Sequence, residues 1–217
     1  MADPTDHLAA ALPEPDDPQL GTTIGARADG EPSEVAAVLD RSGPVHAFDE
    51  AVDRWFGRHL RGRPPVDRVM YTASELADFS LLWHLIGVAR GLRSERDFQA
   101  TLRLSTALGL ESTVVNGLLK SLVKRERPVA EFERPLHLRV PLTSSFPSGH
   151  ASAAFCAATL LSDGDRLAPL YYATAAIAAS SRVHVRIHHA SDVVVGAAIG
   201  LTLGRLVRRA WALPSAR

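Results

Sequence analysis

Several features are missing or scarce in this chain of 217 residues, and each absence excludes a class of structure. The single cysteine, Cys156, cannot form a disulfide within the chain, and its apolar neighbours indicate a small buried side chain. No stretch shows the alternation of a half-buried strand, and no internal repeat is present, so we predict an all-α fold. The N-terminus lacks a basic segment followed by an apolar one, and we therefore expect no secretory signal peptide.

Long apolar runs are also missing. None reaches the roughly 18 uncharged apolar residues that identify a membrane-spanning helix. The best runs, 167–181 and 193–204, are short and rich in alanine and glycine. Closely packed membrane helices nevertheless use small residues at their contacts, and a buried polar site explains charges within such helices. Composition alone leaves open whether the chain is soluble or embedded in a membrane.

Charge is balanced overall but unevenly distributed. Residues 1–50 hold 11 of the 24 acidic residues, whereas 22 of the 24 basic residues lie in 51–217. A basic body is typical of proteins that bind nucleic acid, anionic lipid or a phosphorylated substrate. The arginines here are scattered between apolar helical runs without interleaved aromatics, which argues against nucleic acid as a partner.

The chain divides into a tail and one domain. Residues 1–44 are acidic and proline-rich, which predicts a disordered tail, and 45–217 form the domain. Apolar residues from Phe48 to Leu60 recur at helical spacing opposite charged ones, which predicts an amphipathic helix lying on a membrane surface or on the domain. Further helices are predicted over 74–91, 98–125, 150–161, 166–182 and 190–211. The expected architecture is an all-α bundle of five or six helices.

Three stretches carry the candidate chemistry: 120–128, 147–150 and 181–192. Together they supply three cations, two histidines and a carboxylate: Lys120, Arg127, Arg182, His150, His188 and Asp192. Arginine offers planar forked donors and lysine a point charge to a small oxyanion such as phosphate. Histidine is the side chain that changes charge near neutral pH. The chain has only two lysines against 22 arginines, so a lysine within this group supports a specific role.

His188 and Asp192 are the predicted nucleophile and its partner. They are four residues apart, which makes them neighbours on one face if a helix begins early enough. A carboxylate at one imidazole nitrogen fixes the tautomer and leaves the other nitrogen free to attack. Two alternatives stay open on spacing alone: Asp192 as an acid favoured by a helix N-terminus, and His189 as the nucleophile.

Ser148, Gly149 and His150 stand where the fourth predicted helix begins. Exposed backbone N–H groups at such a start bind anions, so we predict that Ser148 and Gly149 contact a phosphate. His150 is the predicted general acid that protonates the leaving oxygen. The alternative is an ordinary proline–glycine helix start with a surface histidine.

Lys120 and Arg127 are seven residues apart, about two helical turns, so we expect both to point from one face as the third helix ends. With Arg182 they would neutralise phosphoryl oxygens, which is most of the catalytic task in phosphoryl transfer. We assign the other basic residues nearby to the rim or the surface: Lys124, Arg125 and Arg186. His184 is expected either at the rim or as a satisfied polar group.

The three stretches resemble the signature of the type 2 phosphatidic acid phosphatase (PAP2) family, which includes the vanadium haloperoxidases and bacterial acid phosphatases. That signature reads Lys, six residues, Arg-Pro; then Pro-Ser-Gly-His; then Ser-Arg, five residues, His, three residues, Asp. Every fixed position is present between Lys120 and Asp192. The resemblance selects His188 over His189 and implies a phosphohistidine intermediate. It also implies chemistry without metal or cofactor.

We therefore predict a metal-independent phosphatase in a multi-pass protein of the cell membrane. Its substrate would be a lipid phosphate monoester or diphosphate of the polyprenyl or phospholipid type. Homo-oligomerisation is left open. One alternative is a soluble acid phosphatase or vanadate-dependent haloperoxidase on the same site, and another is a non-catalytic membrane protein that binds anionic lipid. We further expect the helix ends that carry the motifs to lie together, with the charged turns 93–97 and 162–166 at the opposite ends.

Overall fold

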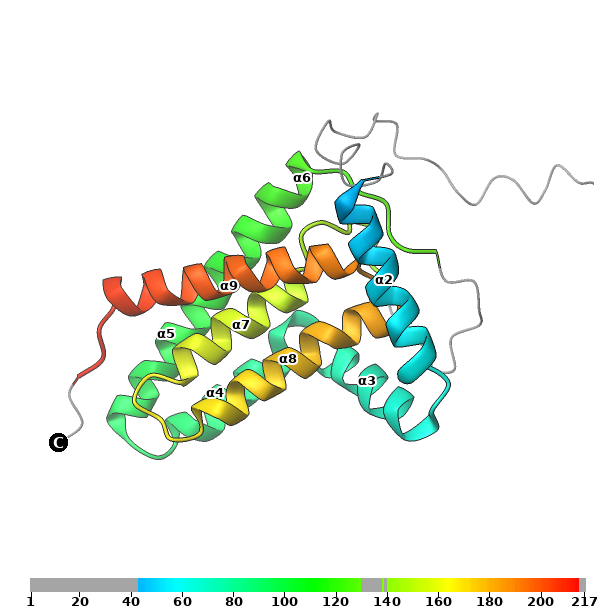
Figure 1. The fold of residues 1–217 in the computed structure, drawn as a ribbon. Helices are drawn as coiled ribbons and strands as arrows, with labels where there is room; N and C mark the ends of the chain where they lie inside the picture. Colours follow the sequence, from blue (N-terminus) through cyan, green and yellow to red (C-terminus); the bar gives the residue numbers. More distant parts are fainter. Residues whose placement is uncertain (1–42, 130–137, 139, 215–217) are drawn as a thin grey trace, which may run out of the picture. The chain divides into compact units, whose positions relative to one another are not determined.

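The computed structural model describes residues 43–129, 138 and 140–214, except for the side chain of Phe79. All regular structure within these residues is helical (Figure 1), which confirms the predicted all-α class. The predicted acidic tail, 1–44, lies outside the described residues except for its last two. Residues 130–137 and 139, in the loop before the second motif, lie outside them as well.

Seven α-helices of ten or more residues, with shorter turns between them, form the described part. The helices are α2 (Pro44–His59), α3 (Pro64–Leu76), α4 (Leu81–Gly91), α5 (Glu95–Ser112), α7 (Gly149–Leu161), α8 (Ala168–His184) and α9 (Ala190–Ala210). A 3₁₀ turn, Asp78–Ser80, precedes α4, and a π-helical segment, Thr113–Leu119, joins α5 to the short α6 (Lys120–Leu122). The predicted helices over 150–161, 166–182 and 190–211 agree with α7, α8 and α9 to within two residues.

The predicted helix over 74–91 is wrong in extent. Pro64 and Pro65 begin a separate helix, α3, because proline suits the first turn of a helix. The chain then turns through the 3₁₀ segment, and Ser80 adopts a left-handed conformation with φ of 58°. This residue separates α3 from α4, so two helices replace the predicted one.

The predicted helix over 98–125 also ends too late. Helical conformation stops at Leu122, and Val123 is extended. The following segment bonds to the loop before α7: the Arg125 amide donates to Ser144 Oγ at 3.0 Å, and the Ser145 amide donates to Arg125 O at 3.0 Å. These long-range bonds hold 123–127 extended, so Lys120 and Arg127 do not share a helical face.

The core is built around α7, which is buried along nearly its whole length and packs against α9, α8 and α5. Contact between α7 and α9 is close because α9 presents a glycine at every fourth position: Gly196, Gly200 and Gly204. A Cβ atom at Gly200 would lie 2.1 Å from the carbonyl oxygen of Ser152, and one at Gly196 would lie 2.4 Å from that of Ser148. Small residues at this spacing let two helix backbones approach each other.

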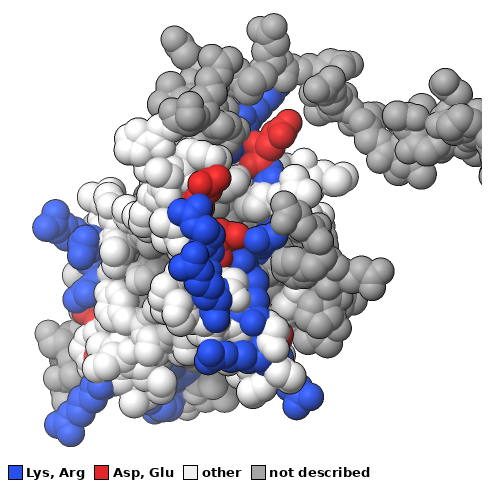
Figure 2. Space-filling model, turned by 45° about the vertical axis from the view of Figure 1, so that its right-hand side comes forward, with Lys and Arg blue, Asp and Glu red and all other residues white. Residues whose placement is uncertain are grey.

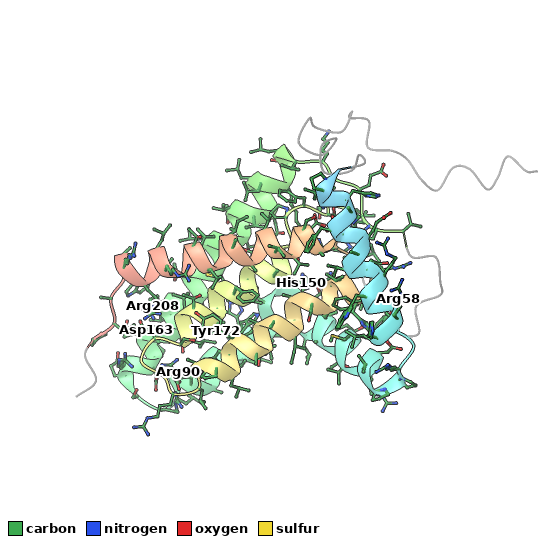
Figure 3. All side chains as sticks on the ribbon, in the orientation of Figure 1. Arg58, Arg90, His150, Asp163, Tyr172 and Arg208 are labelled. Carbon is green, nitrogen blue, oxygen red and sulfur yellow. The ribbon has the colours of Figure 1, made fainter. Side chains whose placement is uncertain are left out.

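The motifs and the charged turns lie at opposite ends of these helices. The site end comprises the end of α6, the end of α8 and the starts of α7 and α9. The far end comprises the α4–α5 turn, the α7–α8 turn and the C-terminal end of α9. Figure 3 shows His150 on α7 well away from Arg90, Asp163 and Arg208, which gather at the far end. The far end is joined by ion pairs such as Arg90–Asp97 and Arg103–Asp163, each at 2.8 Å.

Helix α2 lies on the domain, which resolves one of the alternatives left open by the sequence. Phe56 is buried against Val183 and Ala190, between α8 and α9. Asp49, expected on the polar outer face, is also buried and 5% exposed. Trp55 keeps 51% of its surface exposed. On the face of the molecule seen in Figure 2, Lys and Arg side chains form a band with few Asp or Glu beside it, in keeping with the basic surplus of 51–217.

Candidate active site

The first and third motifs meet at His188. The chain turns sharply between α8 and α9, where the amides of Ile187 and His188 both donate to the Arg182 carbonyl at 3.1 Å. His188 is 2% exposed, and its Nε2 lies 3.4 Å from Nη1 of Arg127. Its Nδ1 lies 3.6 Å from Oδ2 of Asp192. One imidazole nitrogen therefore faces a carboxylate and the other a guanidinium.

Asp192 caps helix α9 and also lies near His188. Because α9 begins at Ala190, His188 stands outside the helix and His189 is its N-cap. The carboxylate of Asp192 accepts the His189 amide at 2.9 Å and so caps the helix while it approaches His188. Burial lowers the pKa of His188 to about 3, against the opposing effect of Asp192. The imidazole is therefore neutral at pH 7, as a nucleophile must be.

Arg127 is held in the extended segment by backbone carbonyl groups. Its guanidinium donates to Thr143 O at 2.9 Å, to Ser144 O at 3.2 Å and to Ile187 O at 2.9 Å. Burial lowers the pKa of Arg127 to about 10, so the group stays cationic at neutral pH. These bonds tie the first motif to the other two and fix the cation beside the Nε2 atom of His188.

The second motif begins α7 as predicted, and its backbone is fixed by the third. Ser148 is the N-cap of α7, and its amide donates to the Asp192 carbonyl at 3.1 Å. Its hydroxyl accepts from the Ala151 amide at 3.4 Å. Gly149 follows, and a Cβ atom there would lie 2.7 Å from Oδ1 of Asn116, so a side chain at this position would require Asn116 to move. The Ser148 amide is therefore engaged within the protein, and the residue is fully buried.

His150 has a carboxylate partner that the sequence analysis missed. Its Nε2 lies 2.8 Å from Oδ1 of Asp78, in the 3₁₀ turn between α3 and α4. The side chain of His150 is 15% exposed, more than that of His188. No spacing rule in the sequence links residues 78 and 150. The interruption at Ser80, which the single predicted helix overlooked, is what places Asp78 here.

The remaining two predicted cations also converge on this site. Nη1 of Arg182 donates to Ser74 Oγ of α3, and Arg182 is 1% exposed. Lys120, half-buried at the end of the π-helical segment, is close enough to Arg127, Arg182 and Asp192 for their charges to act on one another. All eight predicted site residues therefore lie at the site end.

Arg125 does not lie at the rim, and this assignment is corrected. The side chain is 3% exposed and bridges two carboxylates. Its Nη1 donates to Oδ1 of Asp192 at 2.5 Å, and its Nη2 donates to Oδ2 of Asp49 at 2.8 Å. Asp49 in turn accepts from both the amide and the hydroxyl of Ser191, each at 2.7 Å. The predicted helix over 98–125 gave no indication that the Arg125 side chain points into the protein.

Two neighbouring basic residues are also tied to other helices. Nη2 of Arg186 lies 2.7 Å from Oδ2 of Asp53 in α2. His184, expected at the rim or as a satisfied polar group, does not lie at the rim: it is 1% exposed, and its Nε2 lies 2.8 Å from Oδ1 of Asp67, whereas its Nδ1 has no hydrogen-bond partner among the described residues. Within the described residues, no group of three or more His, Cys, Asp or Glu side chains is arranged to hold a metal ion.

Sequence comparison finds relatives among proteins of known function. A decaprenylphosphoryl-5-phosphoribose phosphatase of Mycobacterium tuberculosis (strain ATCC 25618 / H37Rv) is 38% identical over 93 residues, which are 42% of this chain and 50% of that protein. A lipid A 1-phosphatase of Porphyromonas gingivalis is 44% identical over 69 residues, which are 29% of this chain and 15% of that protein. The chain thus spans about half or less of the length of these curated relatives.

Structural comparison finds the same fold over more of the chain. The transmembrane PAP2 type phosphatidylglycerolphosphate phosphatase from Bacillus subtilis superposes with a TM-score of 0.62 and 26% identity, over 81% of this chain and 89% of that one. Aquifex aeolicus LpxE superposes with a TM-score of 0.59 and 25% identity, over 74% and 94%. The sequence profile of the PAP2 superfamily matches residues 100–213, more than half of the chain, including all three motifs. The chain belongs to the PAP2 superfamily.

Proposed function

We propose that this protein is a phosphatase that hydrolyses a lipid phosphate through a covalent bond to His188. The observation that carries the proposal is the setting of His188, with Nδ1 beside Asp192 and Nε2 beside Arg127. A neutral imidazole, oriented through one nitrogen, presents the lone pair of the other to a phosphorus atom held by a cation.

The reaction proceeds in two steps. His188 Nε2 attacks phosphorus, the bond to the lipid oxygen breaks, and His150 gives its proton to that oxygen. Water then attacks the phosphohistidine while His150 takes a proton from it, which releases inorganic phosphate and restores both histidines. Lys120, Arg127 and Arg182 neutralise the phosphoryl oxygens throughout, and the carboxylate of Asp78 stabilises the protonated form of His150.

The outer surfaces of the helices support a place in a membrane. On α4 and into the turn after it, the exposed face is apolar at helical spacing: Leu81, Leu85, Val88 and Leu92 are 50–85% exposed. The face continues along α5 and beyond through Phe98, Leu102, Leu110, Val114, Leu118 and Leu122. Contact of so large an apolar surface with water is unfavourable, whereas contact with lipid chains is not.

Length and composition mark one helix most clearly. Among the described helices, α9 alone is both long and apolar enough to cross a membrane. The shorter helices α4, α7 and α8 pack around it or around its neighbours, and their small residues suit close packing within a bilayer. We propose a multi-pass arrangement in the cell membrane, with α9 as one span. The transmembrane character of the B. subtilis protein supports it.

The substrate class rests on the relatives as well as on the membrane. Both sequence relatives are named for lipid substrates, one with a decaprenyl chain and one with lipid A. We propose a polyprenyl or phospholipid phosphate, with the apolar tail lying along the outer helices and the phosphate among the three cations.

Phosphate release from purified protein tests the proposal. The substrates are an undecaprenyl phosphate and diphosphate, phosphatidic acid, and the soluble p-nitrophenyl phosphate, each in neutral detergent. We expect lipid substrates to be preferred, chelators to have no effect, and vanadate to inhibit as a phosphate mimic. Absence of release from every substrate, or dependence on an added divalent ion, would contradict the proposal.

A further inference from the structure

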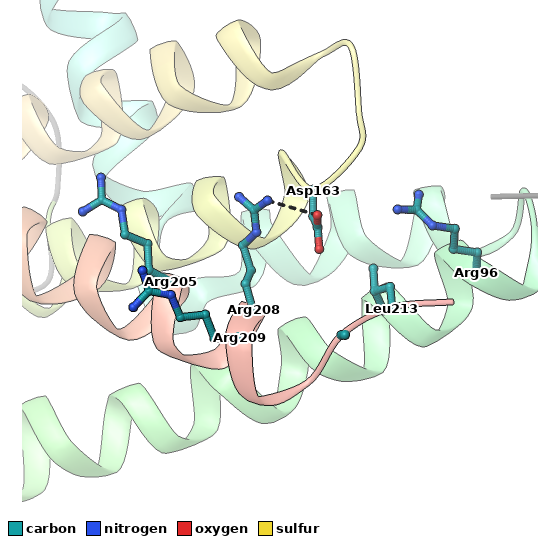
Figure 4. A pocket seen from close by; sticks show the side chains of 7 residues that line it. Arg96, Asp163, Arg205, Arg208, Arg209 and Leu213 are labelled. Atoms are coloured by element: carbon teal, nitrogen blue, oxygen red, sulfur yellow. Dashed lines mark hydrogen bonds and ion pairs between the residues drawn. The ribbon is translucent and has the colours of Figure 1, made fainter. Parts of the chain in front are cut away.

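A second basic site lies at the far end, away from His188. It is a cleft of about 400 Å³ between the C-terminal end of α9 and the start of α5. Four arginines and one carboxylate are among its lining residues: Arg96, Arg205, Arg208, Arg209 and Asp163. Figure 4 shows Arg208 reaching Asp163, with Arg205 and Arg209 beside it on α9 and Arg96 on α5.

The positive charge of this cleft exceeds what the described carboxylates neutralise. Asp163 is shared between Arg208 at 3.1 Å and the buried Arg103 at 2.8 Å. Arg205 and Arg209 form no hydrogen bond or ion pair within the part of the chain that the structure describes. Like charges are brought together here at a cost, and an anion between them would remove that cost.

The partial negative charge at the C-terminal end of α9 explains only some of the arginines in this cleft. The C-terminus of α9 carries partial negative charge, which Arg208 and Arg209 in its last turn offset. Arg96 belongs to a different helix, and its Nε donates to the carbonyl of Pro214 at 3.0 Å, which places it across the cleft from α9. Arginines from two helices therefore face one space.

We propose that this cleft binds a phosphate group, with the headgroup of an anionic phospholipid as its source. Arginine binds phosphate oxygens through paired N–H donors. The cleft lies at the end of α9, the helix best suited to cross a membrane, and Trp211 beside it is 38% exposed, as expected at the level of lipid headgroups. Basic clefts between helices at this level bind such headgroups. The proposal adds a lipid site to the proposed membrane protein and does not involve the catalytic groups.

Native mass spectrometry of the purified protein in neutral detergent tests the site. Phosphatidylglycerol is titrated in one arm and inorganic phosphate in the other, for the wild type and for the Arg205→Ala/Arg209→Ala double variant. The matched control is Arg166→Ala, an exposed arginine in the α7–α8 turn that does not line the cleft. We expect the double variant to bind phosphatidylglycerol about tenfold more weakly than the control, with unchanged phosphatase activity.

The two arms separate the sources of the phosphate. Arginine-dependent binding of phosphatidylglycerol alone supports the lipid headgroup, and arginine-dependent binding of inorganic phosphate alone supports the anion site but replaces the lipid by free phosphate. Equal binding by the double variant and the control, for both probes, overturns the site. Activity is measured separately, so a failure here leaves the proposed function untouched.

An independent observation concerns the buried group of Asp49, Arg125 and Asp192. Asp49, in helix α2, accepts from Nη2 of the Arg125 guanidinium, and Nη1 of the same guanidinium donates to Asp192. Asp49 also fixes the first turn of α9 through Ser191. All three charged side chains are at most 5% exposed. We infer that Asp49 and Arg125 are positioning residues that set the carboxylate of Asp192 against His188.

This inference rests on the proposed function, and its test uses a control in the same helix. Asp49→Asn weakens the bond to Arg125. Asp53→Asn, in the same helix α2, disturbs the ion pairs of Asp53 with Arg61 and Arg186, neither of which includes Asp192. We expect Asp49→Asn to lower kcat about 10–100-fold with KM changed less than about twofold, and Asp53→Asn to leave kcat within about twofold.

A second variant keeps the test independent of folding. Arg125→Lys retains the charge but loses the paired donors, so kcat should fall in the same range while the thermal midpoint stays near that of Asp53→Asn. Equal kcat in the Asp49 and Asp53 variants would overturn the inference. Activity of the wild type, abolished in His188→Ala, shows separately whether the proposed function holds.

Discussion

At the scale of single residues, the site contains two pairs of histidine and carboxylate with different exposures. His188 with Asp192 is buried, whereas His150 with Asp78 is partly open to solvent. A nucleophile benefits from a dry and fixed setting, and a group that exchanges protons with leaving groups and water benefits from contact with solvent. The difference in exposure thus matches the proposed difference in roles.

The first prediction separates His188 from His189. His188→Ala removes the attacking nitrogen and should lower kcat at least about a thousandfold. His189 caps α9 through its side chain and donates its backbone amide to Asp192; alanine retains the amide, so His189→Ala should keep most of the activity. Single-turnover phosphate release measures both. Reversed behaviour of the two variants would show that the third motif is misassigned.

The second prediction concerns Asp78. Asp78→Asn removes the carboxylate that stabilises protonated His150 and should lower kcat for a lipid phosphate about tenfold to a hundredfold. A p-nitrophenolate leaving group needs no proton, so the loss with p-nitrophenyl phosphate should be much smaller. Steady-state kinetics on the two substrates provide the comparison. Equal losses would mean that Asp78 does not act through proton transfer to the leaving oxygen.

At the scale of elements, the contact between α7 and α9 sets the geometry of the site. These helices carry His150 and Asp192, and the Ser148 amide is bonded to the Asp192 carbonyl. The glycines of α9 allow this approach, because any side chain at Gly200 would meet backbone atoms of α7. Backbone atoms cannot rotate away as the end of a side chain can, so the close contact is a firm requirement.

The third prediction tests that contact. Gly200→Ala places a methyl group 2.1 Å from the Ser152 carbonyl and should reduce stability by about 1–3 kcal/mol, with loss of activity as the helices separate. Gly109→Ala in α5 is the control, since a Cβ atom there meets nothing within 4 Å. This control should be neutral or stabilising by up to about 1 kcal/mol. Thermal unfolding in detergent compares them, and equal midpoints would contradict the packing described for α7 and α9.

At the scale of the whole molecule, the chemistry and the charge network occupy different ends of the helices. The far end joins α5, α7 and α9 through Arg103, Asp163 and Arg208. Burial raises the pKa of Asp163, but the hydrogen bond and charge of Arg103 outweigh it and hold the pKa below its usual value of 3.8. The network therefore stabilises the fold at the end of the helices away from the candidate site.

The fourth prediction follows from the sign of that shift. A carboxyl whose pKa is lower in the folded state contributes stability above its unfolded pKa and loses it as the pH falls through the folded pKa. Stability should therefore decline below about pH 4, and Asp163→Asn should be less stable at pH 7 by about 2 kcal/mol. The difference between variant and wild type should shrink in acid. Unfolding midpoints across pH measure this, and a constant difference would contradict the assignment.

The sequence by itself determined the family, the candidate site residues and much of the local structure. The motifs supply His188, His150 and three cations at spacings typical of the family, and α7 and α9 begin and end where periodicity and turn residues predict. These signals are readable because they depend on neighbours within a few residues. The breaks at Ser80 and Val123 carried no such signal, and the helices there were misjudged.

The tertiary structure alone decided which other charges serve the site. Asp49 reaches Arg125 across 76 residues, Arg125 reaches Asp192 across 67, and Asp78 meets His150. An exposed ion pair and a buried one look alike in sequence, so Arg125 was placed at the surface and Asp49 on a solvated face. Only packing shows that both are excluded from water. Burial makes the pairing of such charges obligatory, because an isolated charge inside the protein would be far too costly.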